Sequence, residues 1–473
     1  MVFSSHLFCF YFLPLALAVY FALPRRARNL GLTLLSYVFY GWAHPAFVFL
    51  MLYSTAIDYV CGLAIARHDT AGETRTRGQR TALVASIVTN LSLLGFFKYF
   101  NFGVDSYDAL VDWLGWQSLA LDTAIRVTLP LGISFYTFQS MSYTIDVYRG
   151  RTAALRNPID FACYVAMFPQ LVAGPIIRFN EVADQLVERR HTWEKAARGV
   201  AFFAMGMGKK ILLANPCGKI ADWCFDAGSV HALDAWYGVA AYAFQIYFDF
   251  SGYSDMAIGL ALVLGFALPK NFDSPYTAQS ISEFWRRWHM SLSRWLRDYL
   301  YVPLGGNRKG RTRTYVNLMT VMLLGGLWHG AAWNFLVWGG FHGVILALER
   351  SRGKEDAYAG FPKPVRIAWT FLLVLVSWVF FRAADLSDAV RYLGHMVGVG
   401  AGPAAGLVGE LLYRPYYLGT FVAAAAVTWT MPQTWDWTRR LTWTKALVCL
   451  GVLALALVMM ETQGFNPFIY FIF

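Results

Sequence analysis

Long apolar stretches recur from one end of the chain to the other, separated by short polar or basic segments. An α-helix of about 20 apolar residues crosses the hydrocarbon core of a bilayer, and a helix satisfies its own backbone hydrogen bonds there. The pattern therefore predicts an all-α polytopic membrane protein with about ten to twelve transmembrane or re-entrant helices. The predicted apolar helices cover residues 7–23, 30–43, 46–66, 82–98, 128–150, 199–214, 235–266, 315–330, 332–348, 364–382, 412–430 and 443–461.

Three segments depart from this pattern. Residues 161–179 are interrupted by Pro169 and Pro175, so too few consecutive apolar positions remain for one straight membrane helix. They predict a re-entrant or kinked element, which an amphipathic stretch at 180–198 follows. Residues 99–117 mix charged and aromatic side chains, which is typical of a helix that lies in the membrane interface.

The composition excludes a soluble globular protein. Of the 473 residues, 57% are hydrophobic and 15% are charged, against about 25% charged residues in soluble domains. The net charge of +11 would suggest nucleic-acid binding in a soluble protein, but cytoplasmic loops that follow the positive-inside rule explain it here. Because Arg25, Arg26 and Arg28 follow the first apolar run, we expect a retained span with its N-terminus outside.

Basic residues concentrate in the polar segment 270–314. Nine of the 40 Lys and Arg residues fall between positions 270 and 313, against three acidic residues, which predicts a cytoplasmic position. The cysteines form no CxxC pair and no Cys/His cluster, so the sequence indicates neither a metal site nor a disulfide framework. They are Cys9, Cys61, Cys163, Cys217, Cys224 and Cys449.

Residues 280–300 have the pattern of one amphipathic helix. Trp285, Trp288 and Trp295 fall on its apolar side, and His289 falls there too. An imidazole is therefore predicted to point to lipid or to the protein interior, where a satisfied structural histidine is the commoner explanation. The arginines of the opposite side are Arg286, Arg287, Arg294 and Arg297.

His329 is the more unusual histidine, because the run from Tyr315 to Leu348 contains no charged residue. A charged side chain at membrane depth costs about 2.5 kcal/mol or more, so an ionisable residue there is a functional hypothesis. A neutral structural imidazole explains the spacing equally well, and we favour that reading for His342. Nearby glycines predict two closely packed helices with room for a ligand. They are Gly325, Gly326, Gly330, Gly339 and Gly340.

Two acidic residues interrupt the apolar stretch 235–266. Asp249 and Asp255 could serve proton transfer or cation binding as a pair of carboxylates. On one straight helix, however, they would face opposite sides. We therefore favour buried or interfacial aspartates that hydrogen bonds fix at a break near Gly252.

Seven sequence blocks follow one another in the order known from one protein family: MVFSS, LPLGISFYTFQSMSYTIDVYRG, FPQLVAGPIIRF, YFDFSGYSDMAIGL, NFDSPY, EFWRRWHMSLSRWLRDYLYVPLGGNR and LLGGLWHG. Together they resemble the membrane-bound O-acyltransferase (MBOAT) family, most closely its bacterial polysaccharide branch, to which alginate O-acetylation belongs. Teichoic acid D-alanyl transfer is a related branch. The resemblance implies a single MBOAT domain over residues 1–473, a helical bundle around a central tunnel, and a catalytic core segment at 270–342.

The resemblance also implies roles for individual residues. His329, in the LWHG motif, matches the family's catalytic histidine, and His289, in the WRRWH motif, matches a second histidine beside it. A histidine can take the proton of the attacking hydroxyl or thiol, so we expect His329 to be the general base or, as the less favoured alternative, a nucleophile. His289 would orient the thioester or stabilise the oxyanion. The predicted substrate-binding residues are Trp285, Asn271, Arg286, Arg287 and Trp328.

The basic segment has two explanations under this resemblance. Its cations would bind the phosphates of acetyl-coenzyme A or of a phosphopantetheine-bearing carrier. Positive-inside topology and contacts with anionic lipids explain the same residues equally well. They are Arg286, Arg287, Arg294, Arg297, Arg308, Lys309 and Arg311.

The resemblance implies an O-acyltransferase of the bacterial inner membrane that moves acetyl groups from a cytoplasmic thioester, such as acetyl-coenzyme A, toward an exported polysaccharide. Periplasmic partner proteins would complete the transfer, and neither a bound cofactor, a metal ion nor nucleic acid is expected. Two other classes stay open. One is an acyl-group conduit or transporter that forms no bonds, which inverted repeats would favour. The other is a scaffold that recruits secreted acetyltransferases.

Overall fold

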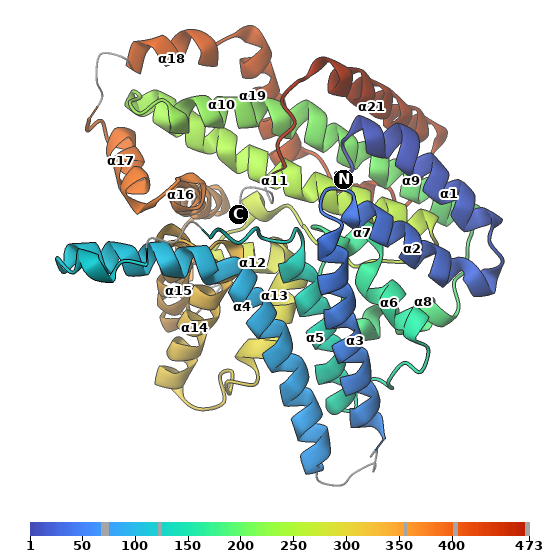
Figure 1. Ribbon diagram of the computed structural model, residues 1–473. Helices are drawn as coiled ribbons and strands as arrows, with labels where there is room; N and C mark the ends of the chain where they lie inside the picture. The colour runs from blue at the N-terminus through green and yellow to red at the C-terminus, as the bar shows by residue number, and fades with distance from the viewer. Residues whose placement is uncertain (68–74, 122–124, 354–356, 401–404, 469–473) are drawn as a thin grey trace. The chain divides into compact units, whose positions relative to one another are not determined.

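A computed structural model describes residues 1–67, 75–121, 125–353, 357–400 and 405–468. Within these ranges every regular element is a helix and none is a strand, which confirms the predicted all-α class. Four of the described helices are long and apolar enough to cross a membrane (Figure 1): α3 (Ala46–Ala66), α4 (Arg77–Trp113), α16 (Lys363–Arg382) and α21 (Trp443–Thr462). The total number of crossings and the tunnel stay predictions.

The chain forms two compact units, residues 7–190 and residues 191–473, with Met1 in the first and Val2–His6 in the second. The catalytic core segment predicted at 270–342 therefore lies wholly in the second unit. The elements of the first unit, besides α3 and α4, are η1 (Leu7–Phe12), α1 (Leu13–Ala22), η2 (Arg25–Ala27), α2 (Arg28–Gly41), η3 (Gln117–Leu119), α5 (Ile133–Tyr148), α6 (Pro158–Ala166), α7 (Phe168–Leu171) and α8 (Phe179–Val187).

Polar side chains join the three helices α3, α4 and α5 of the first unit. Asn90 Nδ2 donates to both carboxylate oxygens of Asp58 at 2.9 Å, and Ser86 Oγ donates to the same carboxylate at 2.6 Å. Ser140 of α5 donates a further hydrogen bond to Asp58. Because Asp58 is fully buried, these bonds replace its water and hold the three helices together.

Two of the segments that depart from the apolar pattern, residues 161–179 and 99–117, lie in the first unit. Residues 161–179 contain the end of α6, the single turn of α7 and a non-helical stretch, which confirms the kinked element. The predicted helix at 99–117 is helical up to Trp113, but it continues α4, which begins at Arg77 and bends sharply along its length (Figure 1). Its position in the membrane interface stays a prediction. No proline lies inside α4, so nothing in the backbone forces the helix to end where the side chains become polar.

The second unit contains the remaining helices. They are α9 (Trp193–Gly208), η4 (Lys209–Ala214), α10 (Asn215–Asp226), α11 (Ala232–Val263), η5 (Pro275–Thr277), α12 (Ile281–Arg287), α13 (Met290–Leu296), η6 (Arg297–Tyr301), α14 (Arg311–His329), α15 (Trp333–Ser351), α16, α17 (Leu386–Met396), α18 (Ala405–Leu412), α19 (Pro415–Thr430), α20 (Thr434–Trp437) and α21.

The long helix α11 packs against α9 and η4, and this contact decides the role of its two aspartates. Asp249 pairs with Lys210 at 2.9 Å, and Asp255 pairs with Lys209 at 2.7 Å. The predicted break near Gly252 is wrong, because α11 is continuous. Gly252 instead lets the Gly206 carbonyl come close, at 2.8 Å from the position of an added Cβ. Two successive lysines on η4 thus pair with the two carboxylates. This agrees with the prediction that both aspartates are structural residues.

Helices α14 and α15 form an antiparallel hairpin, whose two arms lie side by side in Figure 1. A Cβ on Gly326 would overlap the carbonyl of Phe335, and one on Gly339 would overlap the carbonyl of Met322. The predicted close approach at these glycines is confirmed. It brings the last residue of α14, His329, against the first turns of α15.

Candidate active site

The polypeptide around His289 is not the single amphipathic helix predicted over 280–300. Helix α12 ends at Arg287 and α13 begins at Met290, with His289 between them at φ +42°. The segment before α12 forms hydrogen bonds with the backbone groups that the break leaves without helical partners. Asp273 N donates to the Arg287 carbonyl and Met290 N donates to the Asn271 carbonyl, both at 2.9 Å. A non-glycine residue in the left-handed region is strained, and such strain is often found at functional sites.

Asn271 holds the imidazole of His289 in place. Its Oδ1 accepts from His289 Nδ1 at 3.2 Å and from Ser291 Oγ at 2.9 Å, while its Nδ2 donates to Ser254 Oγ at 2.9 Å. The ring of Phe250 lies edge-on to the imidazole, with centroids 4.6 Å apart. Because an amide oxygen accepts from Nδ1, the proton of the neutral ring is on Nδ1 and Nε2 is the acceptor.

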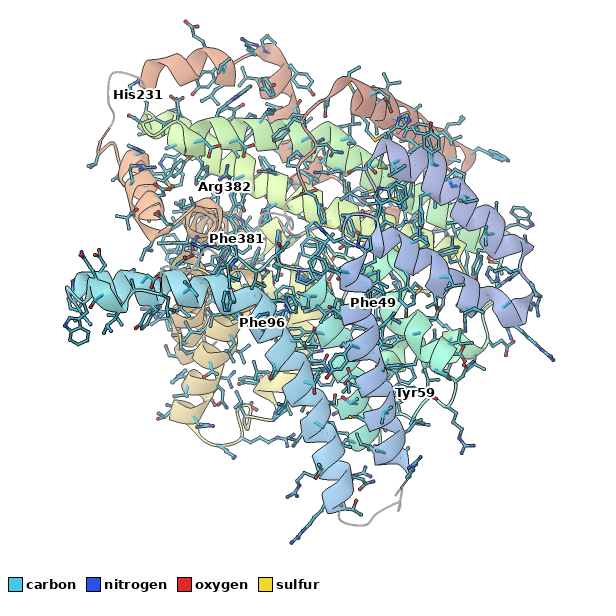
Figure 2. The ribbon with its side chains drawn as sticks, viewed as in Figure 1. Phe49, Tyr59, Phe96, His231, Phe381 and Arg382 are labelled. Carbon is cyan, nitrogen blue, oxygen red and sulfur yellow. The ribbon has the colours of Figure 1, made fainter. Side chains whose placement is uncertain are left out.

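His329 is the last residue of α14 and lies in a cage of aromatic rings. Its ring centroid is 4.9 Å from Trp328, 5.2 Å from Trp338 and 5.1 Å from Phe381, and Figure 2 labels Phe381 at the end of α16. Only 7% of its surface is exposed. Trp328 also lies 6.1 Å from the ring of His289, so one indole contacts both histidines.

A cavity of about 300 Å³ opens beside His329. Most of its walls are apolar, and its cations come from three different helical elements: Arg286 from α12, Arg297 from η6 and Arg350 from α15. Of the predicted substrate-binding residues, Trp285 and Arg286 line it, whereas Asn271, Arg287 and Trp328 do not. The complete lining is Trp285, Arg286, Leu292, Ser293, Leu296, Arg297, Tyr301, Leu318, Val321, Met322, Gly325, His329, Trp338, Leu346 and Arg350.

Helix α15 fixes the wall of this cavity through two residues on one face. His342 Nδ1 accepts from Trp285 Nε1 at 3.4 Å, and the fully buried imidazole does not line the cavity. Glu349 accepts from the backbone N of Ile281 at 2.7 Å and of Ser282 at 2.8 Å, the first amides of α12. His342 therefore has the contacts of a structural residue. Glu349 was not singled out in the sequence analysis. Its spacing of seven residues from His342, which places both on one face of a helix, was the available signal.

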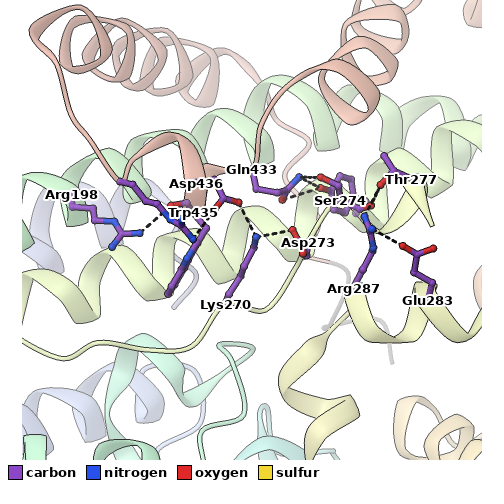
Figure 3. Close-up of polar contacts among 12 residues, drawn as sticks. Arg198, Lys270, Asp273, Ser274, Thr277, Glu283, Arg287, Gln433, Trp435 and Asp436 are labelled. Atoms are coloured by element: carbon purple, nitrogen blue, oxygen red, sulfur yellow. Dashed lines mark hydrogen bonds and ion pairs between the residues drawn. The ribbon is translucent and has the colours of Figure 1, made fainter. Parts of the chain in front are cut away.

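A second polar network anchors the segment that precedes α12 (Figure 3). Lys270 Nζ bonds to Asp273 at 2.7 Å and to Asp436 at 3.0 Å, and Gln433 Nε2 donates to Ser274 Oγ at 2.7 Å. Arg287 belongs to this network as well, since it pairs with Glu283 and donates to Thr277 Oγ1 at 2.9 Å. The guanidinium predicted to bind substrate is therefore engaged within the protein.

Comparison with known proteins identifies the family of the chain. The model of the membrane-bound O-acyltransferase family matches residues 153–384. The chain is 44% identical to the "Probable alginate O-acetylase AlgI" of Pseudomonas putida, over the whole of both proteins. This chain belongs to the membrane-bound O-acyltransferase family.

Two relatives with other names match at lower identity. The chain is 38% identical to the peptidoglycan O-acetyltransferase of Helicobacter pylori over 84% of this chain and 80% of the relative. It is 29% identical to the teichoic acid D-alanyltransferase of Streptococcus thermophilus over 53% of this chain and 68% of the relative. This MBOAT chain is therefore a membrane O-acetyltransferase, and the family resemblance found in the sequence is confirmed. Among the residues that the structure describes, no three His, Cys, Asp or Glu side chains are placed to hold a metal ion.

Proposed function

We propose that this MBOAT protein acetylates an exported polysaccharide and that His329 is its general base. One observation carries the proposal: the buried imidazole of His329 lines an apolar cavity of about 300 Å³ that also contains three arginines. An apolar cavity with a few polar groups suits a small-molecule substrate. The cations suit the phosphates of an acyl-thioester donor, for which acetyl-coenzyme A is the proposed identity.

The proposed orientation places the basic ends of the helices in the cytoplasm of an inner-membrane protein. Helix α14 begins at Arg311 and α15 ends beside Arg350 and Arg352, so the open end of the hairpin is basic and His329 lies at its tip. The 19 residues of α14 rise about 28 Å, close to the roughly 30 Å of the hydrocarbon core, which supports a position of His329 away from the basic end, toward the opposite side of the membrane. The positive-inside rule supports the assignment of sides, and the N-terminus is proposed to lie outside.

The proposed chemistry begins at Nε2 or Nδ1 of His329, which takes the proton of the acceptor hydroxyl while its oxygen attacks the thioester carbonyl carbon. The carbon–sulfur bond then breaks, and the protonated His329 returns the proton to the leaving thiolate. The products are the acetyl ester and the free thiol. A positioned histidine base contributes about 10²- to 10⁴-fold to such a step.

His289 is proposed to act by orientation. With its proton on Nδ1 and that proton held by Asn271, the neutral ring offers only an acceptor at Nε2. It can therefore bind an amide or hydroxyl proton of a substrate, whereas an oxyanion would need a donor. Of the two roles that the family resemblance suggests, the acceptor at Nε2 therefore favours orientation of the substrate.

The test is acetyl transfer by purified protein in lipid vesicles with radiolabelled acetyl-coenzyme A, polysaccharide and candidate periplasmic partners. We expect His329→Ala to remove label from both the sugar and any partner. His231→Ala is the matched control, because His231 is exposed at the start of α11 (Figure 2) and should leave transfer unchanged. Normal transfer by His329→Ala would end the proposal. Passage of label across the membrane without a new ester bond would instead support a conduit.

A further inference from the structure

The second unit contains another cavity, of about 410 Å³, that the acetyl-transfer step does not use. It lies where α10 begins, where α19 begins and just after α21 ends. Its walls combine aromatic rings, two amides and one lysine. The residues that the argument uses are Asn215, Lys219, Tyr416, Tyr417, Gln463 and Phe465.

The polar groups of this cavity form a prepared site rather than a chance gap. Asn215 is only 2% exposed, and its Nδ2 donates to the Phe465 carbonyl at 3.2 Å and to Gln463 Oε1 at 3.3 Å. The buried amide of Asn215 therefore holds Gln463 and Phe465 in the wall of the cavity.

The remaining walls select the kind of ligand. Lys219 Nζ lies 4.0 Å from the ring centroid of Phe465, and Tyr417 is held edge-on to Trp223 at 4.9 Å. Gln463 Nε2 donates to the Tyr416 hydroxyl at 3.2 Å. Aromatic faces pack against apolar C–H faces, amides both donate to and accept from hydroxyl groups, and a lysine binds a carboxylate as a point charge.

The cavity also lies at the end of α21 that is remote from Arg439, Arg440 and Lys445. Helix α21 begins beside Arg440 and Lys445, and its 20 residues rise about 30 Å before Gln463. Helix α19 runs the opposite way and starts at Pro415, so the tyrosines of its first turn lie at the same end. Under the orientation proposed above, this end faces the periplasm.

We propose that this cavity is a binding site for an acidic sugar unit of the acceptor polysaccharide. A hydroxylated ring would stack on the tyrosines and accept a hydrogen bond from the Tyr416 hydroxyl, while its carboxylate would pair with Lys219. The proposal rests on the proposed function for the side of the membrane and for the class of acceptor. It adds a site that holds the polymer apart from the acyl-donor cavity at His329.

Binding can be measured without acetyl transfer, which keeps the two proposals separable. The His329→Ala protein in phosphatidylcholine nanodiscs is titrated by calorimetry with alginate oligosaccharides and with neutral mannose oligosaccharides of equal length. We expect the acidic oligosaccharides to bind more tightly. Lys219→Met should weaken their binding about tenfold, the loss expected for one charged hydrogen bond, and Lys219→Arg should restore part of it.

Lys363→Met is the matched control, because it removes one exposed lysine at the start of α16. The proposal is overturned if Lys219→Met and Lys363→Met bind the acidic oligosaccharides equally well. It is also overturned if anionic phospholipid in the nanodisc abolishes the binding, which would identify a lipid headgroup site. Normal binding without any acetyl transfer by the unmodified protein would refute the proposed function and leave this site standing.

Discussion

Glu349 offers the sharpest test of how this protein builds its donor cavity. The carboxylate is 1% exposed and accepts from two consecutive amides at the start of α12, at 2.7 and 2.8 Å. The first amides of a helix have no partner within the helix. Glu349→Gln keeps one acceptor oxygen but turns an NH₂ group toward the second amide, so one charge-assisted hydrogen bond is lost and one donor is left buried. We expect a loss of about 2–3 kcal/mol in the free energy of unfolding.

The same change should alter catalysis in a particular way, because α12 carries Trp285 and Arg286 into the cavity wall. A displaced α12 weakens donor binding and leaves His329 and the acceptor site in place. We therefore expect the KM for the acyl donor to rise about tenfold, which corresponds to about 1.4 kcal/mol, with the acceptor KM within about twofold. Steady-state acetyl transfer at varied donor and acceptor concentrations measures both values.

Glu461→Gln is the matched control for this prediction. Glu461 is 53% exposed and bonds to His6, and the loss of one exposed ion pair changes stability by about 1 kcal/mol or less. Two outcomes would contradict the proposed role of Glu349 in holding α12. One is that Glu349→Gln unfolds at the same temperature as Glu461→Gln, and the other is that the donor KM and the acceptor KM rise together.

Two further predictions concern the remaining site residues. Arg286→Met should raise the KM for the acyl donor severalfold and reduce the salt dependence of this KM, because Arg286 lines the donor cavity. Arg287→Met should mainly lower stability, because Arg287 pairs with Glu283. Equal effects of the two variants on the donor KM would contradict this assignment. Asn271→Ala should lower kcat about as much as His289→Ala, and the double variant should lose little more, because both changes release the same imidazole. Additive losses would show that the two residues act independently.

Much of the architecture was readable from local patterns. The spacing of apolar residues predicted α3, α14, α16 and α21 to within a few positions, because each helix satisfies its backbone internally and its length follows the bilayer. The run without charges around His329 marked that residue as unusual, since an ionisable group there needs protein around it. Motifs in the right order then indicated the family.

Other features depended on residues far apart in the chain. The break between α12 and α13 follows from backbone hydrogen bonds to residues 271–273, and no local signal in 280–300 marks it. Lys210 on η4 is the partner of Asp249, and Arg350 joins Arg286 in one cavity only because α15 packs on α12. The physical reason is the distance along the chain between interacting residues. Helix periodicity depends on neighbours within a turn or two, whereas the partners of buried polar groups depend on which helices pack together. The sequence by itself therefore determined most of the long helices and the family, and the tertiary structure decided where α12 ends, the cavity and its contacts.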